Sequence, residues 1–294
     1  KDQHLRFYSV NLKDRKRTSL SNLRFKREDR WANYLKGVIS VFQSRGYSSG
    51  GLSFTVSGNI PIGVGLSSSA ALEVATAYAV QKVLGIEIAG PELARLAQEA
   101  ENSFVGVQCG IMDQFVSRMA KSGSVMFIDT RSMDYRHIPI ALRSVKILIT
   151  NSNVPRSLVE SEYNQRRGEC EKCVSLLNPR KSGRSLRDYT AEDLRDSLGL
   201  IPETTRKRCL HVVEENERVR DAESSLRRGE IVSFGKLMNR SHESLRDQYE
   251  VSCPELDWLV KRAWETDGVY GSRMTGAGFG GCTVTLIEEQ AIPQ

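Results

Sequence analysis

The chain has 294 residues, of which 39% are hydrophobic and 27% are charged, and its formal net charge is +6. This length is sufficient for two packed domains. The sequence contains no run of about 18 apolar residues, so we expect no membrane span. The six cysteines are scattered, which predicts reduced thiols of a cytoplasmic protein and excludes a disulfide scaffold.

Basic residues are concentrated between Lys13 and Arg30, near the start of the chain. Runs of charge usually lie in water, and no aromatic stacking pattern accompanies this one, so we interpret it as a solvated surface segment. A nucleic-acid-binding protein is the rival interpretation, which a steep fall of affinity with salt would support. We expect small-molecule partners, with no nucleic acid and no membrane among them.

Helical and strand-like patterns are mixed along the chain rather than strictly alternating, which predicts the α+β class. We place a domain boundary near residue 150, which gives domains at 1–150 and 151–294. Strands are expected at about 52–58, 125–129 and 145–150, with a last strand after residue 281. Helices are expected at 31–43, from the loop after residue 61 to about 84, from Pro91 onward, and at 157–177, 203–228, 230–246 and 254–266.

A glycine–serine loop follows the strand near 52–58, with the sequence Pro61-Ile-Gly-Val-Gly-Leu-Ser-Ser-Ser-Ala-Ala-Leu-Glu73. Glycine lets the backbone approach a ligand closely, and the first amides of the next helix lack intrahelical partners, so phosphate binds well at such a place. A helix capped by one serine is the alternative, but three serines after two spaced glycines exceed what a cap needs. The predicted phosphate-binding residues are Gly63, Gly65, Leu66, Ser67, Ser68, Ser69 and Ala70.

A second glycine loop, Arg273-Met-Thr-Gly-Ala-Gly-Phe-Gly-Gly281, precedes a β-prone segment near the end of the sequence. A tight turn between two strands is the alternative interpretation, but four glycines in six positions are more than a hairpin requires. We expect this loop, with Gly276 and Gly278, to approach a ligand or the first loop and to support the site.

Asp113 lies among apolar neighbours in the stretch Cys109-Gly-Ile-Met-Asp-Gln-Phe115. A carboxylate in such surroundings is either exposed at a turn or partly buried with a chemical task. Most single aspartates are solvated or cap a helix, so the residues alone leave both interpretations open.

These three stretches, in this order, resemble the GHMP small-molecule kinases, and among them the galactokinases. The first loop is similar to the second GHMP motif, and Met274–Cys282 is similar to the third. Further galactokinase-like segments are Arg30–Lys36, Cys109–Phe115, Thr150–Asn153, Ser161–Tyr163 and Ser244–Leu256. The family's first motif, a Gly-Glu-His-Thr-Asp-Tyr type stretch, has no counterpart here, so we expect a family core trimmed at both ends. The resemblance implies a two-domain GHMP-kinase-like fold with the active site in the cleft between the domains and the nucleotide bound by the N-terminal domain.

The resemblance also implies a reaction, the transfer of the γ-phosphoryl group of ATP to the C1 hydroxyl of galactose. The product would be galactose 1-phosphate, at the first committed step of galactose catabolism. Asp113 matches the catalytic base, Ser69 and Glu101 match the Mg²⁺ ligands, and Gly110, Asp113 and Tyr163 match the sugar contacts. Trp31 and Tyr34 match the adenine-side aromatic residues, although ordinary helix packing explains them equally well. ATP and Mg²⁺ are therefore the expected cofactors, and galactose is the expected substrate. We expect a cytoplasmic protein and favour a monomer, although the sequence leaves the oligomeric state open.

Two other functions are compatible with the same resemblance. One is a non-catalytic regulator that senses galactose and ATP, and the other is an N-acetylgalactosamine kinase. The intact Ser67-Ser-Ser-Ala70 stretch favours an enzyme over a sensor, and the Cys109-Gly-Ile-Met-Asp113 stretch favours galactose as the sugar.

Overall fold

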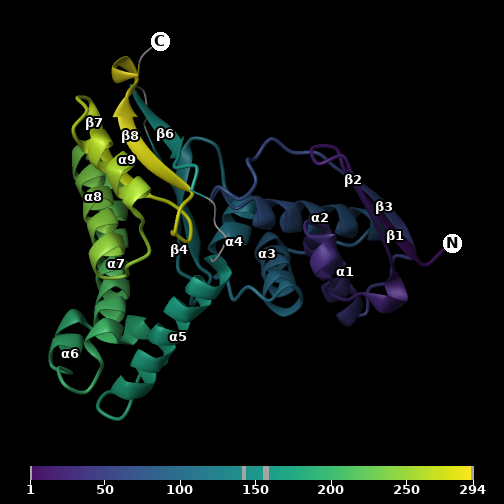
Figure 1. Cartoon of the computed structure of the whole chain (residues 1–294), viewed down its shortest axis with the longest axis horizontal. Helices are drawn as coiled ribbons and strands as arrows, with labels where there is room; N and C mark the ends of the chain where they lie inside the picture. Colours follow the sequence, from purple (N-terminus) through teal and green to yellow (C-terminus); the bar gives the residue numbers. More distant parts are fainter. Residues whose placement is uncertain (1, 141–143, 155–158, 293–294) are drawn as a thin grey trace. The chain divides into compact units, whose positions relative to one another are not determined.

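The computed structural model describes residues 2–140, 144–154 and 159–292 and divides into two compact units (Figure 1). The first unit comprises Lys1–Ile62 and Ser67–His137, and the second comprises Gly63–Leu66 and Ile138–Gln294. The division falls earlier in the chain than the position near 150 that the sequence suggested. The reason is that the strand at Val145–Asn151 pairs with a strand near the end of the sequence and so belongs to the second unit.

The sheet of the first unit has three strands, β1 (His4–Ser9), β2 (Asp14–Ser19) and β3 (Leu52–Val56), in the order β2-β1-β3. Strand β2 runs antiparallel to β1, whereas β3 runs parallel to it. Leu5 and Phe7 alternate toward the core, as expected for a half-buried strand, and Phe7 stacks on Phe54 with the ring centroids 5.6 Å apart.

Helices complete the core of the first unit. Their bounds are α1 (Ala32–Ser44), α2 (Ser68–Leu84), α3 (Gly90–Ala100) and α4 (Met112–Met119), with a π-helical turn at Glu101–Val105. Helix α3 shows why such segments fold: Pro91 lies in its first turn, and its apolar residues Leu93, Leu96, Ala97 and Ala100 are fully buried. Strands β4 (Ser124–Ile128) and β5 (Tyr135–Pro139) pair as a separate two-stranded sheet.

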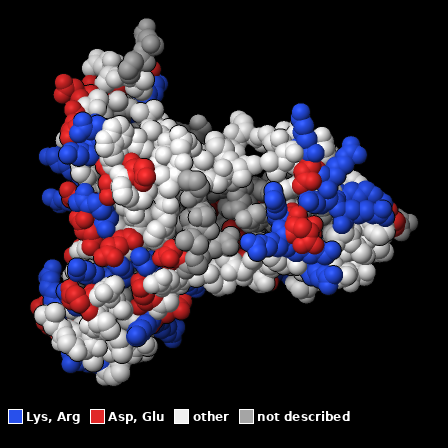
Figure 2. Space-filling model, in the orientation of Figure 1, with Lys and Arg blue, Asp and Glu red and all other residues white. Residues whose placement is uncertain are grey.

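The basic segment near the start of the chain is exposed, as expected, but part of it forms strand β2, which the run of charges concealed. Figure 2 shows Lys and Arg side chains gathered over the strands of the first unit, and Arg15 and Arg17 of β2 are exposed. Strand β2 is the edge of its sheet, and charged side chains on an edge strand prevent pairing with other chains. This role accounts for the exposed basic residues of β2.

The second unit contains a sheet of strands β6 (Val145–Asn151), β7 (Val269–Met274) and β8 (Cys282–Glu288), in the order β6-β8-β7 with both pairs antiparallel. Helices α8 (Ile231–Asp247) and α9 (Pro254–Trp264) pack against β7. Strand β7 is the partner of β8 that the sequence analysis missed, because glycine and serine interrupt its apolar pattern. The second glycine loop connects these two strands.

A helical subdomain lies beyond this sheet in the second unit. It consists of α5 (Val159–Leu177), α6 (Ala191–Arg195) and α7 (Glu203–Arg227), and Cys173, Leu194 and Cys209 are fully buried in its core. The expected helices of this half are confirmed within one or two residues, although residues 157–158 of the first lie outside the described part of the chain. Short 3₁₀ turns occur at Leu20–Asn22, Arg27–Asp29, Leu186–Asp188 and Glu289–Ala291.

The mixture of helices with small, mostly antiparallel sheets confirms the α+β class. All six cysteines are free. Among the described residues, none of the helices is both long and apolar enough to cross a membrane.

Candidate active site

The glycine–serine loop ends at the start of α2, as the sequence predicted. Gly63 and Gly65 have φ angles of +76° and +84°, and a Cβ added at Gly63 would meet no atom within 4 Å. The first backbone hydrogen bond of the helix runs from the Ala71 amide to the Ser67 carbonyl over 3.0 Å. The amides of Ser68, Ser69 and Ala70 precede that bond and therefore lack intrahelical acceptors.

Ser67 does not act as the ordinary capping serine of the alternative interpretation. Its side chain makes no capping hydrogen bond, and its backbone is left-handed with φ +54°. A non-glycine residue in that region is strained, and such strain is concentrated at functional sites. The start of α2 is therefore shaped for something other than self-capping, and anion binding is the function that a free helix start supports.

Two carboxylates are buried together beside this helix start. Glu73, one turn after Ser69 on α2, has no exposed surface, and Glu101, at the start of the π-helical turn, is 7% exposed. The side-chain amide of Gln114 donates to both of them, over 3.1 Å to Glu73 Oε2 and 2.6 Å to Glu101 Oε2. The Ser69 hydroxyl also donates to Glu101. Glu101 is thus a buried carboxylate with polar partners and not an ordinary solvated surface residue.

Burial dominates the electrostatics of this pair. It raises the pKa of Glu73, and the neighbouring Glu101 carboxylate raises that pKa further. Burial also raises the pKa of Glu101, while hydrogen bonds from Glu73, Cys109 and Ser69 oppose that rise. The oxygen Oε1 of Glu73 is buried without a hydrogen-bond partner among the described residues. Such an oxygen-rich and incompletely satisfied cluster is suited to a hard cation.

Asp113 lies in the first turn of α4, half-buried, and the next residue is Gln114. Gln114 is fully buried and fixes the start of α4 on the two carboxylates. Cys109 Sγ lies 3.5 Å from Glu101 Oε2, and burial raises the pKa of this thiol, which stays protonated. The structure therefore brings Ser69, Glu101 and the Asp113 segment together within the first unit.

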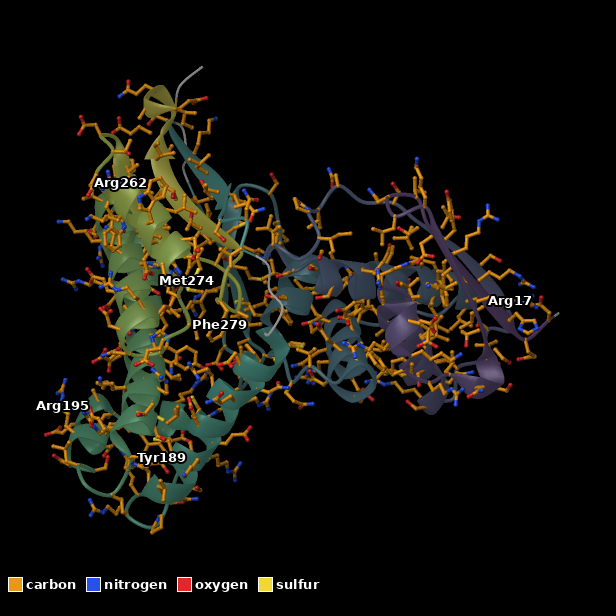
Figure 3. The ribbon with its side chains drawn as sticks, in the orientation of Figure 1. Arg17, Tyr189, Arg195, Arg262, Met274 and Phe279 are labelled. Carbon is orange, nitrogen blue, oxygen red and sulfur yellow. The ribbon has the colours of Figure 1, made fainter. Side chains whose placement is uncertain are left out.

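In the structure the second glycine loop is Thr275–Gly281, because Arg273 and Met274 belong to β7, and it connects β7 to β8 in the second unit. Figure 3 labels Met274 before it and Phe279 within it. Gly276 and Gly278 have φ angles of +77° and +88°. A Cβ at Gly278 would lie 2.1 Å from the Val251 carbonyl oxygen. Close approach within the second unit therefore explains Gly278 without a ligand, while the supporting role expected for the loop stays a prediction.

The other predicted contacts are less distinctive. Gly110 is exposed with open space around its Cα, and Tyr163 is half-buried on α5. Trp31 packs against the core of the first unit, and its indole N–H donates to Asp14 Oδ2 over 3.0 Å, which favours ordinary packing. Tyr34 lies on the same helix, α1. The assignment of these residues to sugar and adenine stays a prediction.

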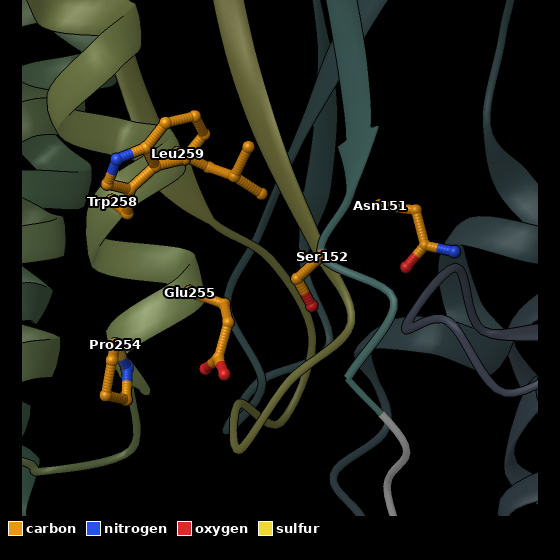
Figure 4. A pocket seen from close by; sticks show the side chains of 6 residues that line it. All are labelled: Asn151, Ser152, Pro254, Glu255, Trp258 and Leu259. Atoms are coloured by element: carbon orange, nitrogen blue, oxygen red, sulfur yellow. The ribbon is translucent and has the colours of Figure 1, made fainter.

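Each unit also has a surface hollow. In the second unit, a hollow of about 350 Å³ lies between the end of β6 and α9, lined by Asn151, Ser152, Pro254, Glu255, Trp258 and Leu259 (Figure 4). In the first unit, a hollow of about 390 Å³ is lined by Ile60, Ala71, Val74, Ala75, Tyr78, Ser117 and Arg118. Neither hollow contains a predicted site residue, so neither identifies the ligand.

Sequence reasoning missed Glu73 and Gln114, the two buried partners of Glu101. A signal for Glu73 was present, since it is the single acidic residue of the alanine-rich helix α2 and lies four positions after Ser69. Gln114 gave no such signal, because its partners lie far away in the sequence.

The unpaired amides at the start of α2 and the buried carboxylates beside them are suited to an enzyme that handles phosphate. Comparison with known proteins defines the class of enzyme. The family models "GHMP kinases N terminal domain" and "GHMP kinases C terminal" match residues 33–121 and 222–294. Nearly the whole chain also matches individual kinases. It is 44% identical over 293 residues to the galactokinase of Roseiflexus sp. (strain RS-1), covering 99% of this chain and 74% of that protein.

Two further matches agree with this one. The chain is 46% identical over 263 residues to the galactokinase of Thermotoga maritima, covering 90% of this chain and 73% of the relative. The crystal structure of Lactococcus lactis galactokinase complexed with galactose superposes with a TM-score of 0.94 at 36% identity, covering 99% of this chain and 76% of that one. The chain belongs to the galactokinase family of the GHMP kinases.

Proposed function

We propose that this protein transfers the γ-phosphoryl group of ATP to the C1 hydroxyl of galactose, giving galactose 1-phosphate and ADP. The observation that carries the proposal is the cluster of Ser69, Glu101 and Gln114 beside Asp113, at a helix start with free amides, in a chain of the galactokinase family. Phosphoryl transfer is catalysed mainly by positioning and by charge neutralisation, and this cluster can supply both.

The residues Gly63–Ala70 are assigned to the phosphates of ATP. The open space over Gly63 and the unpaired amides at the start of α2 support this assignment. The Ser67 side chain makes no capping hydrogen bond, so its hydroxyl is available to a phosphate oxygen.

Ser69 and Glu101 would hold Mg²⁺. The fit rests on oxygen donors alone, a hydroxyl hydrogen-bonded to a buried carboxylate, with the partnerless Oε1 of Glu73 nearby. Mg²⁺ requires only one or two protein carboxylates when substrate phosphates complete its shell. The described residues contain no group of three or more His, Cys, Asp and Glu side chains arranged for a metal, which agrees with a site that is shared with the nucleotide. When bound, Mg²⁺ would neutralise negative charge on the phosphates.

Asp113 is assigned as the base that accepts the proton of the sugar C1 hydroxyl. Its oxygens accept no hydrogen bond from the part of the chain that the structure describes, so they are available to a substrate hydroxyl. A general base must lie within hydrogen-bond reach of the proton that it takes, and Gln114 fixes the start of α4 so that Asp113 is held in place. Gly110 and Tyr163 are assigned to sugar contacts by their match to the family's motifs.

A competition assay tests the proposed reaction. ADP release is followed by a coupled assay with galactose, N-acetylgalactosamine and mevalonate as acceptors, and the sugar phosphate is identified by ³¹P NMR. We expect galactose to be preferred and the product to be the 1-phosphate. Preference for either of the other acceptors would contradict the proposal.

Substitution of Asp113 tests its assigned role. Asp113→Asn keeps the size of the side chain but removes the base, so we expect kcat to fall by about 10²–10⁴-fold with little change in the galactose KM. The matched control is Asp134→Asn, at an exposed position of the same unit, which should leave kcat unchanged. An Asp113→Asn enzyme with more than half of the wild-type kcat would remove Asp113 from the mechanism.

A further inference from the structure

The glycine loop of the second unit is held at both ends by side chains and backbone of other elements. Before the loop, the Met274 amide donates to Nδ1 of His242 over 3.2 Å. Within the loop, the Phe279 amide donates to the carbonyl of Val251 over 2.7 Å. Figure 3 labels Met274 and Phe279. His242 lies on α8, and Val251 lies in the segment between α8 and α9.

These two attachment points are connected to each other through Ser252 and Asp257. The Ser252 hydroxyl donates to Oδ1 of Asp257 over 2.5 Å. The same Asp257 oxygen lies 3.3 Å from Nε2 of His242. This last contact is electrostatic rather than a well-aligned hydrogen bond, because Nε2 has no hydrogen-bond partner of suitable geometry among the described residues. The contacts form a closed ring from Met274 through His242, Asp257 and the Ser252 turn back to Phe279.

The protonation state of His242 is compatible with its contacts to Met274 and Asp257. His242 has no exposed surface, and burial lowers its pKa to about 4, so the imidazole of His242 is neutral near pH 7. A neutral imidazole has one nitrogen that accepts and one that donates. Since Nδ1 accepts from Met274, the proton is on Nε2, which is the nitrogen that faces Asp257. The edge of Trp264 packs against the imidazole at 5.9 Å between the centroids.

The loop needs such support because its backbone is strained. Phe279 has a φ of +55°, which is unusual for a residue with a side chain. Strained backbone of this kind costs about 1–3 kcal/mol per residue and persists only where the surroundings over-determine it. Phe279 is itself packed with Val251, Leu256 and Met274 in a buried cluster.

We propose that His242 and Asp257 are positioning residues, which hold the glycine loop Thr275–Gly281 in the conformation that phosphoryl transfer requires. This inference rests on the proposed function, because the loop is taken as the match to the third motif of the kinase family. Neither residue is assigned to contact with ATP or galactose.

Three variants and one control test the proposal. His242→Leu removes the acceptor of the Met274 amide, whereas His242→Asn retains an acceptor oxygen near the position of Nδ1. Asp257→Asn keeps the size of the side chain and removes the charge that faces Nε2, at a position that is partly exposed. The control is His211→Asn, because His211 is also buried but contacts Ser244 and Tyr249 instead of the loop.

The first readout is independent of catalysis. It combines amide hydrogen exchange of residues 275–281 with the labelling rate of the Cys282 thiol, which is 1% exposed at the end of the loop. Loss of one hydrogen bond corresponds to a change of about tenfold. We expect exchange and labelling to be about tenfold faster in His242→Leu, somewhat faster in Asp257→Asn, largely restored in His242→Asn and unchanged in His211→Asn.

The second readout is kinetic. If the loop is positioned for the reaction, kcat with galactose falls in His242→Leu and recovers in His242→Asn, while the melting temperatures of the two variants stay close. Unchanged loop exchange in both His242→Leu and Asp257→Asn would overturn the proposal, and so would an equal increase in His211→Asn. If the wild-type protein phosphorylates no sugar but the exchange pattern is as expected, the proposed function fails while the support of the loop by His242 stands.

Discussion

Two glycine substitutions separate the two physical reasons for glycine in the site loops. Gly63 and Gly278 both have a positive φ, +76° and +88°, and an L-residue there costs about 1–2 kcal/mol. A Cβ at Gly63 would meet nothing within 4 Å, whereas a Cβ at Gly278 would lie 2.1 Å from the Val251 carbonyl oxygen. Gly63→Ala should therefore lose stability through backbone strain alone, whereas Gly278→Ala should also create a steric clash.

The size of each effect follows from these geometries. Overpacking costs about 1–3 kcal/mol, and displacing Val251 would also weaken its hydrogen bond with the Phe279 amide, which contributes about 1 kcal/mol. We expect the free energy of unfolding to fall by about 3–6 kcal/mol in Gly278→Ala and by only about 1–2 kcal/mol in Gly63→Ala. Gly199→Ala is the matched control, since Gly199 has a φ of +82° and open space in a surface turn.

Urea denaturation measures the free energy of unfolding of the three variants, and ATP titration measures their affinity for the nucleotide. The new methyl group at Gly63 would occupy space that we assign to phosphate, so ATP affinity should fall by about tenfold or more, equivalent to about 1.4 kcal/mol. Gly199→Ala should lose the same stability as Gly63→Ala and bind ATP normally. Wild-type ATP affinity in Gly63→Ala would refute the phosphate assignment, and equal destabilisation by Gly278→Ala and Gly63→Ala would refute the argument from close approach.

Three further predictions concern single side chains. Ser69→Ala removes the hydroxyl beside Glu101, so the Mg²⁺ concentration for half-maximal activity should rise about tenfold, and an unchanged Mg²⁺ titration would make Ser69 a packing residue. Lys36→Met leaves Asp29 without its buried cation, whose Nζ lies 2.7 Å from the carboxylate, so urea denaturation should show a loss of about 3 kcal/mol or more. The corresponding loss for the surface residue Arg45→Met should be below about 1 kcal/mol. Burial lowers the pKa of His211 to about 4 from 6.5. The unfolded chain therefore binds the proton first, so stability that is complete above pH 6.5 should fall by about 3 kcal/mol toward pH 4, and His211→Gln should remove this part of the pH dependence.

The parts of the fold that could be predicted are those whose pattern is local. The inner face of α3 and the proline starts of α3 and α9 are visible in the sequence, and the structure confirms them. Strand β2 could not be recognised, because the edge position that makes Arg15 and Arg17 favourable is a property of the sheet and not of the segment. Strand β7 was missed because glycine and serine interrupt its apolar pattern, while its pairing with β8 is decided across the glycine loop.

The same distinction applies to the site. The start of α2, with Gly63 and the serines, could be predicted because loop and helix are adjacent in sequence. The role of Gln114 could not be predicted, since it depends on α2, the π-helical turn and α4 meeting at one point. Resemblance to the family supplied Glu101 and Asp113 without this physical reason, and the structure now shows that one amide group links the segments that carry them.

Burial of the two carboxylates also lowers the stability of the first unit. A fold selected only for stability would place apolar side chains where Glu73 and Glu101 lie, since burying charge costs more than packing returns. The cost is reduced by Gln114, which satisfies one oxygen of each carboxylate, but Glu73 Oε1 and Gln114 Oε1 keep no partner among the described residues. Perturbed, incompletely satisfied groups of this kind are concentrated at functional sites. Because Gln114 follows Asp113 directly on α4, the group that offsets this cost also fixes the segment that carries Asp113, the proposed base. We therefore expect stability and catalysis to depend on the same side chain.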